Sequence, residues 1–447
     1  MPAPAYRATT LRRRYPGEHL IRFRRDVLGA FERMAATGGD LVQVRVGPRR
    51  VVLVRHPDLA REVLIDRHAA FTKSRALRLS KFLLGEGLLT SEDAFHQRQR
   101  KLVLPAFHHT RLRSYGTAMV RLTEEHVAGW TEAEPVALDR EMMRLTLRIA
   151  ARTLFAADVD DERGEIYRAL TASLGVARRV SNPLAEWFLR LPLPSTRRLE
   201  RARDRLDALV LGLIDDRRRD GADHGDLLSM LLAAQDEDTG RGMTDRQVRD
   251  EVMTLFLAGH ETTAQALAWT GYLLARHPDV QARLHAEVDA ALGGRPASFD
   301  DLARLGYARQ VLAEAMRLYP PAYAIGRESR EPVEVGGTPL PAGTTVLIGT
   351  ITMHHDPRFW PAPERFDPDR FAPGASADRP RFAYLPFSTG RRGCIGEQFA
   401  WAEGVLVLAT LAQRWRLHPA ADRHPGLDPS MTLRPRRRVA LRLERHP

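Results

Sequence analysis

The chain of 447 residues has a single cysteine, Cys394. One thiol cannot form a disulfide within the chain, and it cannot supply the several cysteines of a structural zinc or iron–sulfur site. A lone cysteine is most often a small buried apolar residue. The residues around Cys394 therefore decide whether it carries chemistry.

Long apolar runs and linkers are missing as well. No uncharged apolar segment reaches the roughly 18 residues that a membrane-spanning helix needs. Residues 1–15 lack the apolar core and the cleavage site of a secretory signal. No Gly/Ser-rich, Pro-rich or single-sign tract separates two folding patterns, and no repeat is present. We therefore expect one domain over residues 1–447, with no membrane span, in the cytoplasm.

Lysine is scarce, because Lys73, Lys81 and Lys101 are the only lysines in the chain. The net charge of +12 is thus carried almost wholly by arginines, which are interleaved with acids. The chain has no basic stripe with interleaved aromatic residues and no zinc-finger spacing, which argues against nucleic-acid binding. A basic face that docks an acidic protein fits this charge pattern better.

The hydrophobic pattern predicts a mainly α fold with a small β part. Amphipathic helices follow one another from about residue 57 to residue 289. The longest begins after Thr244, which forms a capping-box pair with Gln247, and ends near Arg276 before His277-Pro278. Further helices are expected over 279–292, over 305–318 and after Cys394.

Strands and irregular segments account for the rest of the chain. Strands are expected over 41–46, 50–54, 332–350 (a hairpin that turns at Gly336-Gly337) and 431–443 (a β pair). Residues 74–93 are less regular and form a candidate mobile loop, while prolines break up a connector at 181–195. The long aperiodic segment 350–386 is typical of a functional region.

The most specific motif surrounds the cysteine: Phe387-Ser-Thr-Gly390-Arg-Arg392-Gly393-Cys394-Ile-Gly396. A thiolate needs hydrogen-bond donors, and Cys394 stands just before a helix whose free N–H groups point toward it. The glycines permit a tight turn and a close approach of the backbone to a flat macrocycle. At every defined position this loop resembles the haem-binding signature of the cytochrome P450 family. The resemblance makes Cys394 the iron ligand, places Phe387 and Gly396 beside the cofactor, and pairs Arg392 with a haem propionate.

A second motif, Ala258-Gly259-His260-Glu261-Thr262-Thr263, lies midway along the longest predicted helix, between apolar flanks that indicate burial. Ala264 stands where a zinc protease would carry its second histidine, so that interpretation fails. The motif resembles the (Ala/Gly)-Gly-x-(Asp/Glu)-Thr sequence of the family's distal helix. The resemblance places Ala258 and Gly259 at the haem and makes Glu261 and Thr262 catalytic. Thr262 would hydrogen-bond dioxygen and Glu261 would relay protons; the alternative is a solvated polar patch on a helix.

A third motif, Glu314-Ala-Met-Arg317, would by itself indicate only a weak surface ion pair. It is followed by Leu318-Tyr-Pro-Pro321 and lies upstream of the cysteine loop, so it resembles the family's Glu-x-x-Arg motif. The family adds another arginine to this buried, structural network, and Arg370 fits that position best. Arg365 stands in the same local pattern and is the competing candidate.

Other basic residues resemble the family's propionate ligands. His96 and Arg100 stand one turn apart on a predicted helix and so face the same side. Arg327 follows the Glu-x-x-Arg helix at a position where the family often binds a propionate. The pairs His108-His109 and His354-His355 have no cysteine or carboxylate at ligand spacing and are interpreted as loop or surface residues.

The resemblance runs from about residue 41 to the C-terminus. It implies a mainly α fold with a small β subdomain that holds haem b (iron protoporphyrin IX). The implied activity is the insertion of one atom of dioxygen into a C–H or C=C bond of a lipophilic substrate. Terpenoid, fatty acid, polyketide and steroid substrates are all compatible with the sequence. Besides the loop at 74–93 and the connector near 181–194, the expected pocket residues are Ala322, Tyr323, Ala324, Ile325 and Thr432.

The implied electron source is a separate ferredoxin with its reductase, because the chain has no dinucleotide-binding or iron–sulfur motif of its own. Arg98, Lys101 and Arg391 are the expected docking residues for such an acidic partner. The alternatives are a peroxide-driven enzyme, a non-oxidative haem-thiolate isomerase or dehydratase, and a haem-binding sensor or carrier. The first two typically lack an acid–alcohol pair such as Glu261 and Thr262, and a sensor would not need Thr262.

Overall fold

The computed structural model describes residues 6–156, 194–236 and 239–447. Its α-helices are α1 (Glu18–Arg25), α2 (Val27–Ala35), α3 (Pro57–Arg61), α4 (Arg75–Leu79), α5 (Lys81–Leu84), α6 (Asp93–Val103), α7 (His109–Ala128), α8 (Leu138–Phe155), α11 (Pro194–Asp220), α12 (Leu227–Ala233), α13 (Asp245–Arg276), α14 (Pro278–Leu292), α15 (Gly306–Leu318), α16 (Thr350–His354) and α17 (Glu397–Ala412). Single π or 3-10 turns cover Glu62–Asp66, His68–Ala70, Leu104–Phe107, Phe299–Ala303, Pro368–Phe371, Arg381–Ala383 and Gly390–Arg392.

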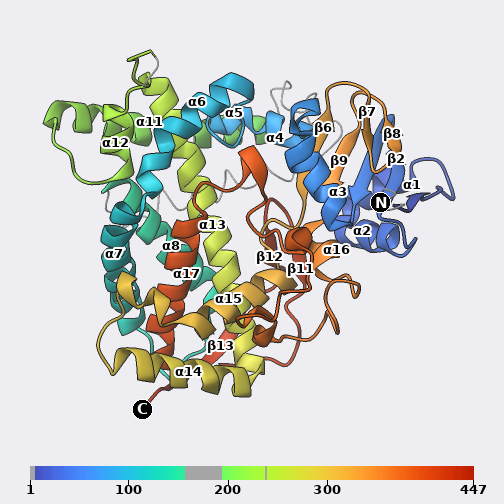
Figure 1. The fold of residues 1–447 in the computed structure, drawn as a ribbon. Helices are drawn as coiled ribbons and strands as arrows, with labels where there is room; N and C mark the ends of the chain where they lie inside the picture. The colour runs from blue at the N-terminus through green and yellow to red at the C-terminus, as the bar shows by residue number, and fades with distance from the viewer. Residues whose placement is uncertain (1–5, 157–193, 237–238) are drawn as a thin grey trace.

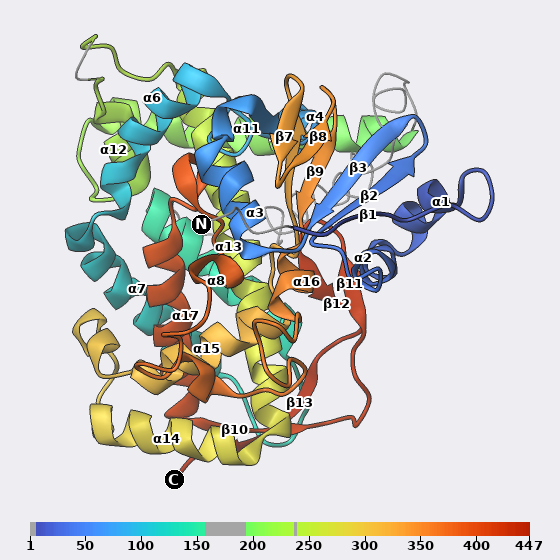
Figure 2. The same ribbon diagram turned by 45° about the vertical axis from the view of Figure 1, so that its right-hand side comes forward.

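The strands are short and form four separate sheets. They are β1 (Ala8–Thr10), β2 (Leu41–Val46), β3 (Arg49–Val54), β4 (Phe71–Lys73), β5 (Val136–Ala137), β6 (Ile325–Ser329), β7 (Val333–Val335), β8 (Thr338–Leu340), β9 (Thr345–Ile348), β10 (Trp415–Pro419), β11 (Leu427–Pro429), β12 (Leu433–Pro435) and β13 (Ala440–Arg445). The largest sheet lies to one side of a helical body, together with α1, α2 and α3 (Figures 1 and 2). The predicted mainly α fold with a small β part is confirmed.

The largest sheet has six strands in the order β1-β2-β3-β9-β6-β4. The predicted pairing of β2 with β3 around Gly47 is confirmed, with Leu41 opposite Val54. The predicted hairpin over 332–350 is only partly right. Its turn at Gly336-Gly337 joins β7 to β8, but β9 lies parallel to β3 and antiparallel to β6 in the large sheet. The chain leaves the hairpin, and β9 becomes an inner strand of the large sheet in which Val346 and Ile348 are buried.

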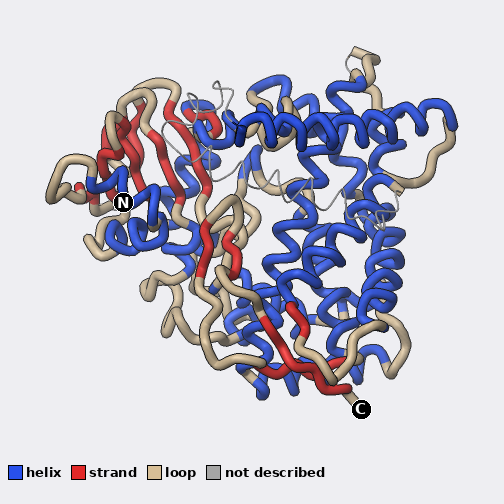
Figure 3. Tube along the Cα trace, turned by 180° about the vertical axis from the view of Figure 1, so that it is seen from behind, coloured by secondary structure: helices blue, strands red, loops and turns tan. Residues whose placement is uncertain are grey.

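The predicted β pair over 431–443 is wrong in its partners. β12 pairs with β11 in a two-stranded hairpin, whereas β13 pairs with β10 and β5 in another sheet. Seen from behind, these two groups of strands lie apart (Figure 3). Alternation of apolar residues identifies a strand but does not say which neighbour it joins, because any strand with a matching face can pair with it.

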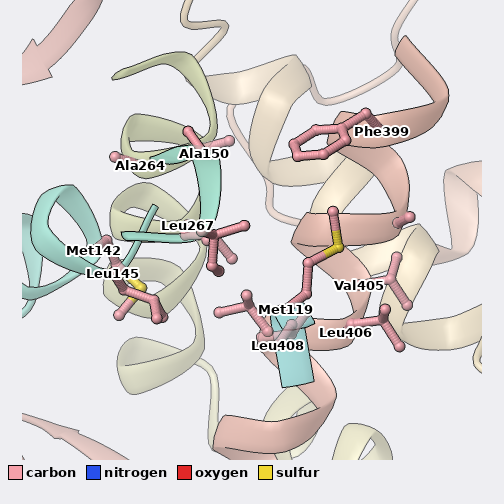
Figure 4. Close-up of a cluster of buried hydrophobic side chains, with 14 of the residues drawn as sticks. Met119, Met142, Leu145, Ala150, Ala264, Leu267, Phe399, Val405, Leu406 and Leu408 are labelled. Atoms are coloured by element: carbon pink, nitrogen blue, oxygen red, sulfur yellow. The ribbon is translucent and has the colours of Figure 1, made fainter. Parts of the chain in front are cut away.

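The helical body is built around α13, which crosses its centre (Figure 1). The predicted capping box is confirmed, because Thr244 Oγ1 accepts from Gln247 N at 3.3 Å and Gln247 Oε1 accepts from Thr244 N at 2.9 Å. The helix ends at Arg276 before Pro278, as predicted. Almost its whole surface is buried. Side chains from α7, α8, α13 and α17 meet in one apolar cluster that includes Met119, Met142, Leu267 and Leu406 (Figure 4).

The predicted mobile loop over 74–93 contains the short helices α4 and α5 and is tied to α13. The backbone N–H of Glu86 donates to Asp250 Oδ2 at 2.8 Å, and that of Leu88 donates to Glu251 Oε2 at 2.9 Å. Residues 181–193 of the predicted connector lie outside the described residues. Within the described part of the chain, no helix combines the length and the apolar character that crossing a membrane requires.

Candidate functional site

Three neighbouring residues interrupt the burial of α13. Residues 248–257 and 263–271 are buried without exception, but Ala258 is exposed and Gly259 and Thr262 are partly exposed. Positions 258, 259 and 262 lie on one face of a helix because of its period. No described atom lies within 4 Å of a Cβ built on Gly259. This face of α13 therefore opens onto free space in the middle of the molecule.

The Thr262 hydroxyl donates to Ala258 O at 2.7 Å, and the Thr263 hydroxyl donates to Gly259 O at 3.2 Å. Both hydroxyls therefore bond carbonyls one turn back, as threonines within helices commonly do. The ladder is not broken, since α13 is continuous from Asp245 to Arg276. The free space beside Thr262 therefore comes from the small size of Ala258 and Gly259.

The cysteine loop folds back on itself ahead of α17. Cys394 N donates to Phe387 O at 2.9 Å, and Gly393 N donates to Gly390 O at 3.0 Å. Gly390 has φ +72°, and a Cβ there would lie 2.6 Å from Leu64 O, so both the conformation and the contact require glycine. Phe387 packs on Trp401 with ring centroids 5.6 Å apart. The loop is rigid, and it presents Cys394 at the start of the helix.

The Cys394 side chain is accessible rather than sealed in the core. The surrounding protein nevertheless raises the pKa of this thiol by desolvation, while the backbone N–H of Gly396 and the charge of Arg100 lower the pKa. Arg100 reaches the loop directly, because its Nη1 donates to Gly393 O at 2.9 Å. An accessible sulfur with two groups that favour its anion is a suitable ligand for a soft metal ion.

Basic side chains from four segments gather beside this loop, and we call them the cationic cradle: Lys73 (β4), His96 and Arg100 (α6), Arg327 (β6) and Arg392 (cysteine loop). His96 and Arg100 do face the same side of α6. His96 is buried, and its Nε2 has no hydrogen-bond partner among the described residues. Arg327 is buried too, and its Nη1 donates to the adjacent Gly326 O at 3.0 Å.

The cradle is short of negative charge. Burial and the charge of Arg392 lower the pKa of Lys73 to about 6 and the pKa of Arg327 to about 10. Burial, Arg392, Lys73 and Arg100 lower the pKa of His96 to about 3. Glu92 is the carboxylate in direct contact, through an ion pair with Arg392 and hydrogen bonds from the Thr72 hydroxyl and Lys73 N. Buried cations that depress one another's pKa values in this way indicate a site for an anionic group. The two propionates of haem fit it.

Arg392 is expected on a propionate, and the structure gives it two protein partners. Its Nη1 donates to Ser91 O at 2.6 Å, and its Nη2 pairs with Glu92. These contacts hold the guanidinium next to His96 and Arg327, within the cradle. Lys73 extends into the same cluster, where its Nζ donates to Leu88 O at 2.6 Å.

A second cluster of charged residues, which we call the charge network, consists of Glu314 and Arg317 on α15 and Arg370 in the 3-10 turn Pro368–Phe371. Arg317 is fully buried and donates twice to Glu314, from Nε at 2.7 Å and Nη2 at 2.8 Å. Its Nη1 donates to His354 O at 2.8 Å. Arg370 Nε lies 3.3 Å from Glu314 Oε1. Burial raises the pKa of Glu314, and these cations together with the N–H of Asp367 oppose that rise.

The structure separates the two candidate arginines of this network. The side chain of Arg370 contacts Glu314, whereas Arg365 contributes its backbone oxygen, which accepts from Arg317 Nη2 at 3.2 Å, and its side chain is exposed. The interpretation of His354 as a loop or surface residue is wrong. His354 is fully buried, and its Nε2 accepts from Leu385 N at 3.0 Å, because it links α16 to the segment before the cysteine loop.

Glu261 has partners that the sequence did not predict. It is buried on α13, and its Oε1 accepts from the Thr432 hydroxyl at 2.5 Å and from Arg434 Nε at 2.8 Å. Thr432, an expected pocket residue, therefore directs its hydroxyl to Glu261. The other expected pocket residues differ in environment. Ala322 is exposed, Ala324 and Ile325 are half-buried, and Tyr323 donates its hydroxyl to Pro429 O and Ser430 O, each at 3.3 Å.

The three expected docking residues are not equivalent. Arg98 pairs with Asp236 at 3.3 Å and donates to the Arg241 and Gly242 carbonyls, so its guanidinium is engaged within the chain. Lys101 and Arg391 are exposed. Arg391 stands in the cysteine loop itself and so marks the surface that lies nearest to Cys394.

Sequence reasoning missed Lys73, Glu92 and Arg434. One signal was present for Lys73, because a lysine stands out in a chain whose positive charge is almost all arginine. No such signal marks Arg434, which is followed by Arg436, Arg437 and Arg438. His108 and His109 are both exposed, as interpreted from the sequence. No group of three or more metal-ligating side chains occurs among the residues of the described ranges.

The chain was compared with known protein families, relatives and structures. The family model described as Cytochrome P450 matches residues 18–442. Cyclooctatin synthase of Streptomyces melanosporofaciens is 42% identical over 90% of this chain and 86% of its own. Cyclooctat-9-en-7-ol 5-monooxygenase of the same organism is 42% identical over 85% and 83%. Pentalenene oxygenase of Streptomyces avermitilis is 36% identical over 87% and 86%.

A solved structure gives the same result. The haem domain of cytochrome P450DA superposes with a TM-score of 0.89 over 100% of this chain and 98% of that chain, at 28% sequence identity. The match covers the helical body and the β-rich part alike. The thiol, the cationic cradle and the open face of α13 thus occur in a chain whose whole fold is that of a haem protein.

Proposed function

The chain belongs to the cytochrome P450 family and is a haem-binding monooxygenase, and from this premise we propose that its substrate is a terpenoid. The observation that carries the proposal is the pair of Streptomyces relatives at 42% identity over more than four fifths of the chain. A third relative is named for pentalenene, and these relatives modify terpenoids. The apolar and small residues at the open face of α13 suit such a lipophilic molecule.

The residues of the chain have distinct proposed tasks. Cys394 would hold the haem iron, and haem held there would supply the oxygen and electron-transfer chemistry. The cationic cradle binds the propionates and so fixes the plane of the cofactor. Ala258 and Gly259 leave room for dioxygen and substrate, and the buried apolar residues around them exclude water. Phe387 shields the sulfur, and the charge network holds the segment before the cysteine loop.

Glu261 and Thr262 are the proposed route for protons. In monooxygenation one oxygen atom enters the substrate and the other leaves as water, which takes up two protons and two electrons. Thr262 lies on the open face with its hydroxyl hydrogen directed to Ala258 O, so its oxygen can accept a further hydrogen bond. Glu261, the adjacent residue, is a carboxylate that can take protons from water and pass them on.

The electrons come, we propose, from a ferredoxin and its reductase. The support is the basic balance of the chain together with the exposure of Lys101 and Arg391 near the cysteine loop. Opposite charges on the two partners speed their encounter in a salt-dependent way.

A spectral and product screen tests the substrate. The purified protein is titrated with cyclooctat-9-en-7-ol and pentalenene, and with palmitate and progesterone for comparison. A terpenoid that displaces water from the iron is expected to shift the Soret band. It should then gain one labelled oxygen atom from isotopic dioxygen in the presence of a surrogate ferredoxin, its reductase and NADPH. Turnover of palmitate or progesterone without turnover of either terpenoid would contradict the proposal.

A further inference from the structure

The carboxylate of Glu261 is held by a β-hairpin that lies far away in the sequence. Arg434, on β12, donates to Glu261 Oε1 from Nε at 2.8 Å and also from Nη2. Thr432, at the end of the turn, donates to the same oxygen at 2.5 Å. The three hydrogen bonds converge on Oε1, so the other carboxylate oxygen takes part in none of them. Glu261 is 2% exposed and the Arg434 side chain 24% exposed.

The hairpin that carries these two residues is itself fixed on both sides. Leu433 N donates to Pro321 O at 3.0 Å, and Leu433 O accepts from Trp269 Nε1 at 3.0 Å. Trp269 stands on α13 two turns after Glu261. The Tyr323 hydroxyl donates at 3.3 Å to Pro429 O, on the other strand of the hairpin and opposite Leu433. The guanidinium of Arg434 is thus held at a set distance from α13 by backbone contacts that do not involve Glu261.

The hairpin also joins the proton route to the segments that are expected to contact substrate. Pro321 and Tyr323 belong to the stretch before β6 that contains the expected pocket residues 322–325. Met431, at the tip of the turn, is 37% exposed although it is large and apolar. A molecule that contacts the turn at Met431 therefore contacts the residue next to Thr432. Any movement of the turn is transmitted to Oε1 of Glu261 through one hydroxyl and one guanidinium.

A buried carboxylate in an apolar helix needs such partners. Burial removes the solvation that water would give a charged group, and hydrogen bonds and an opposite charge replace that solvation. The nearest other ionisable side chain on α13 is His260, which is buried, has Nδ1 2.8 Å from Phe256 O, and has its pKa lowered by burial. His260 is therefore neutral at physiological pH and cannot replace Arg434. Arg434 alone, among the described contacts of Glu261, carries a positive charge and also reaches solvent.

We propose that Arg434 is the positioning residue of Glu261 and that Thr432 is its second restraint, so that the β11–β12 hairpin sets the delivery of protons. The inference rests on the proposed role of Glu261 as the proton carrier. Arg434 and Thr432 hold the carboxylate in one orientation, with Oε1 turned to the hairpin. Movement of the turn releases Oε1 and lets the carboxylate carry a proton from the solvent side of Arg434 toward Thr262.

The test compares variants of the holoenzyme with the terpenoid chosen by the screen above, or with cyclooctat-9-en-7-ol if several bind. The variants are Arg434→Met, Arg434→Lys, Thr432→Val and Glu261→Gln. Arg437→Met is the matched control, since Arg437 is an exposed arginine three positions further on. Product formed per NADPH, hydrogen peroxide released and the solvent isotope effect are measured across pH. The reduced carbon monoxide spectrum establishes that each variant is folded around thiolate-ligated haem.

We expect Glu261→Gln to slow product formation roughly a hundredfold, as loss of a general acid–base group does. Arg434→Met is expected to lower product per NADPH roughly tenfold, the factor for a charge-assisted hydrogen bond, with peroxide as the alternative product. Arg434→Lys should recover most of that loss, Thr432→Val should lose less than Arg434→Met, and Arg437→Met should match the parent.

The double variant separates positioning from a structural role. In the Glu261→Gln background, Arg434→Met should add no further loss of coupling, because no carboxylate is left to position. Independent, multiplying losses would overturn the proposal, as would an Arg434→Met variant that behaves like Arg437→Met. If Glu261→Gln itself stays coupled, the proposed role of Glu261 fails instead. Should Arg434→Met not fold, Arg434→Lys and Thr432→Val decide between these outcomes by the same readouts.

Discussion

The charge network and the cationic cradle are both buried and both rich in arginine, yet they differ in how their charges are balanced. In the charge network Arg317 donates to Glu314 twice and to the His354 and Arg365 carbonyls, so all of these donors have acceptors. In the cradle Lys73, His96, Arg327 and Arg392 lie together, and they lower one another's pKa values. The charges of the charge network are balanced within the chain, whereas the cationic cradle is complementary to an anion.

This difference explains why similar residues have different tasks. A buried ion pair that satisfies itself contributes little net energy, but removing one partner leaves an isolated buried charge. A cluster of like charges destabilises the protein until a ligand of opposite charge binds. The charge network therefore affects the stability of the fold, whereas the cationic cradle affects the binding of the cofactor.

The largest effect, on the stability of the fold, is expected from removing a charge from the charge network. Glu314→Gln preserves shape but removes the charge opposite Arg317, which is 0% exposed. We expect the free energy of unfolding to fall by about 3–5 kcal/mol, measured by urea denaturation of the holoprotein. Arg365→Gln is the control, because only its backbone oxygen joins the network. Equal stability of these two variants would contradict a structural role for the charge network.

A smaller effect, on haem binding and not on the fold, is expected from removing a cation from the cationic cradle. Arg327→Gln removes a buried cation whose guanidinium donates to a backbone oxygen, that of Gly326. Haem should transfer to apomyoglobin roughly tenfold faster than from the parent, as for loss of a supporting contact around a cofactor. The helical content of the Arg327→Gln variant should equal that of the parent. Arg113→Gln, which loses an exposed pair with Asp300 at 2.7 Å, should leave the transfer rate unchanged. Loss of fold without faster haem loss would contradict the assignment.

The pH dependence of haem retention tests the same cluster at Lys73. Burial, with the charge of Arg392, lowers the pKa of Lys73 to about 6, and a nearby propionate raises this pKa. Haem binding then takes up a proton, so retention is strongest below pH 6 and weakens as pH rises through the raised pKa. Lys73→Met should flatten this slope in the transfer assay. An unchanged slope would place Lys73 outside the propionate site.

The smallest effect concerns charges that neither pair nor bind the cofactor. Arg391→Glu reverses an exposed charge in the cysteine loop. We expect reduction by ferredoxin to be slower at low salt and to approach the parent rate at high salt, since screening removes the difference. Stopped-flow reduction measures this, with Arg437→Glu, an exposed arginine outside the cysteine loop, as the control. Equal rates at low salt would remove Arg391 from the docking face. Arg98 is a weaker test because it is engaged with Asp236.

The sequence predicted those parts of the site that depend on short spacings. Gly390, Arg392 and Cys394 occupy one loop, and Thr244 with Gln247 starts one helix, so local chemistry was enough to identify them. Glu314 and Arg317 are one turn apart for the same reason. The choice between Arg370 and Arg365 was not local, since both stand in the same sequence pattern and only the path of the chain directs one side chain inward.

By itself the sequence determined the family resemblance, the iron ligand that it implies, the central helix with its capping box and the mainly α fold, because each follows from residues within a few positions of one another. Only the tertiary structure decided that β9 joins β3 and β6, that β12 and β13 belong to different sheets, and that Lys73 joins the cradle. It also paired Glu261 with Arg434, 173 positions further along the chain. Contacts over such separations are selected by the packing of whole elements, and no local pattern of residues encodes them.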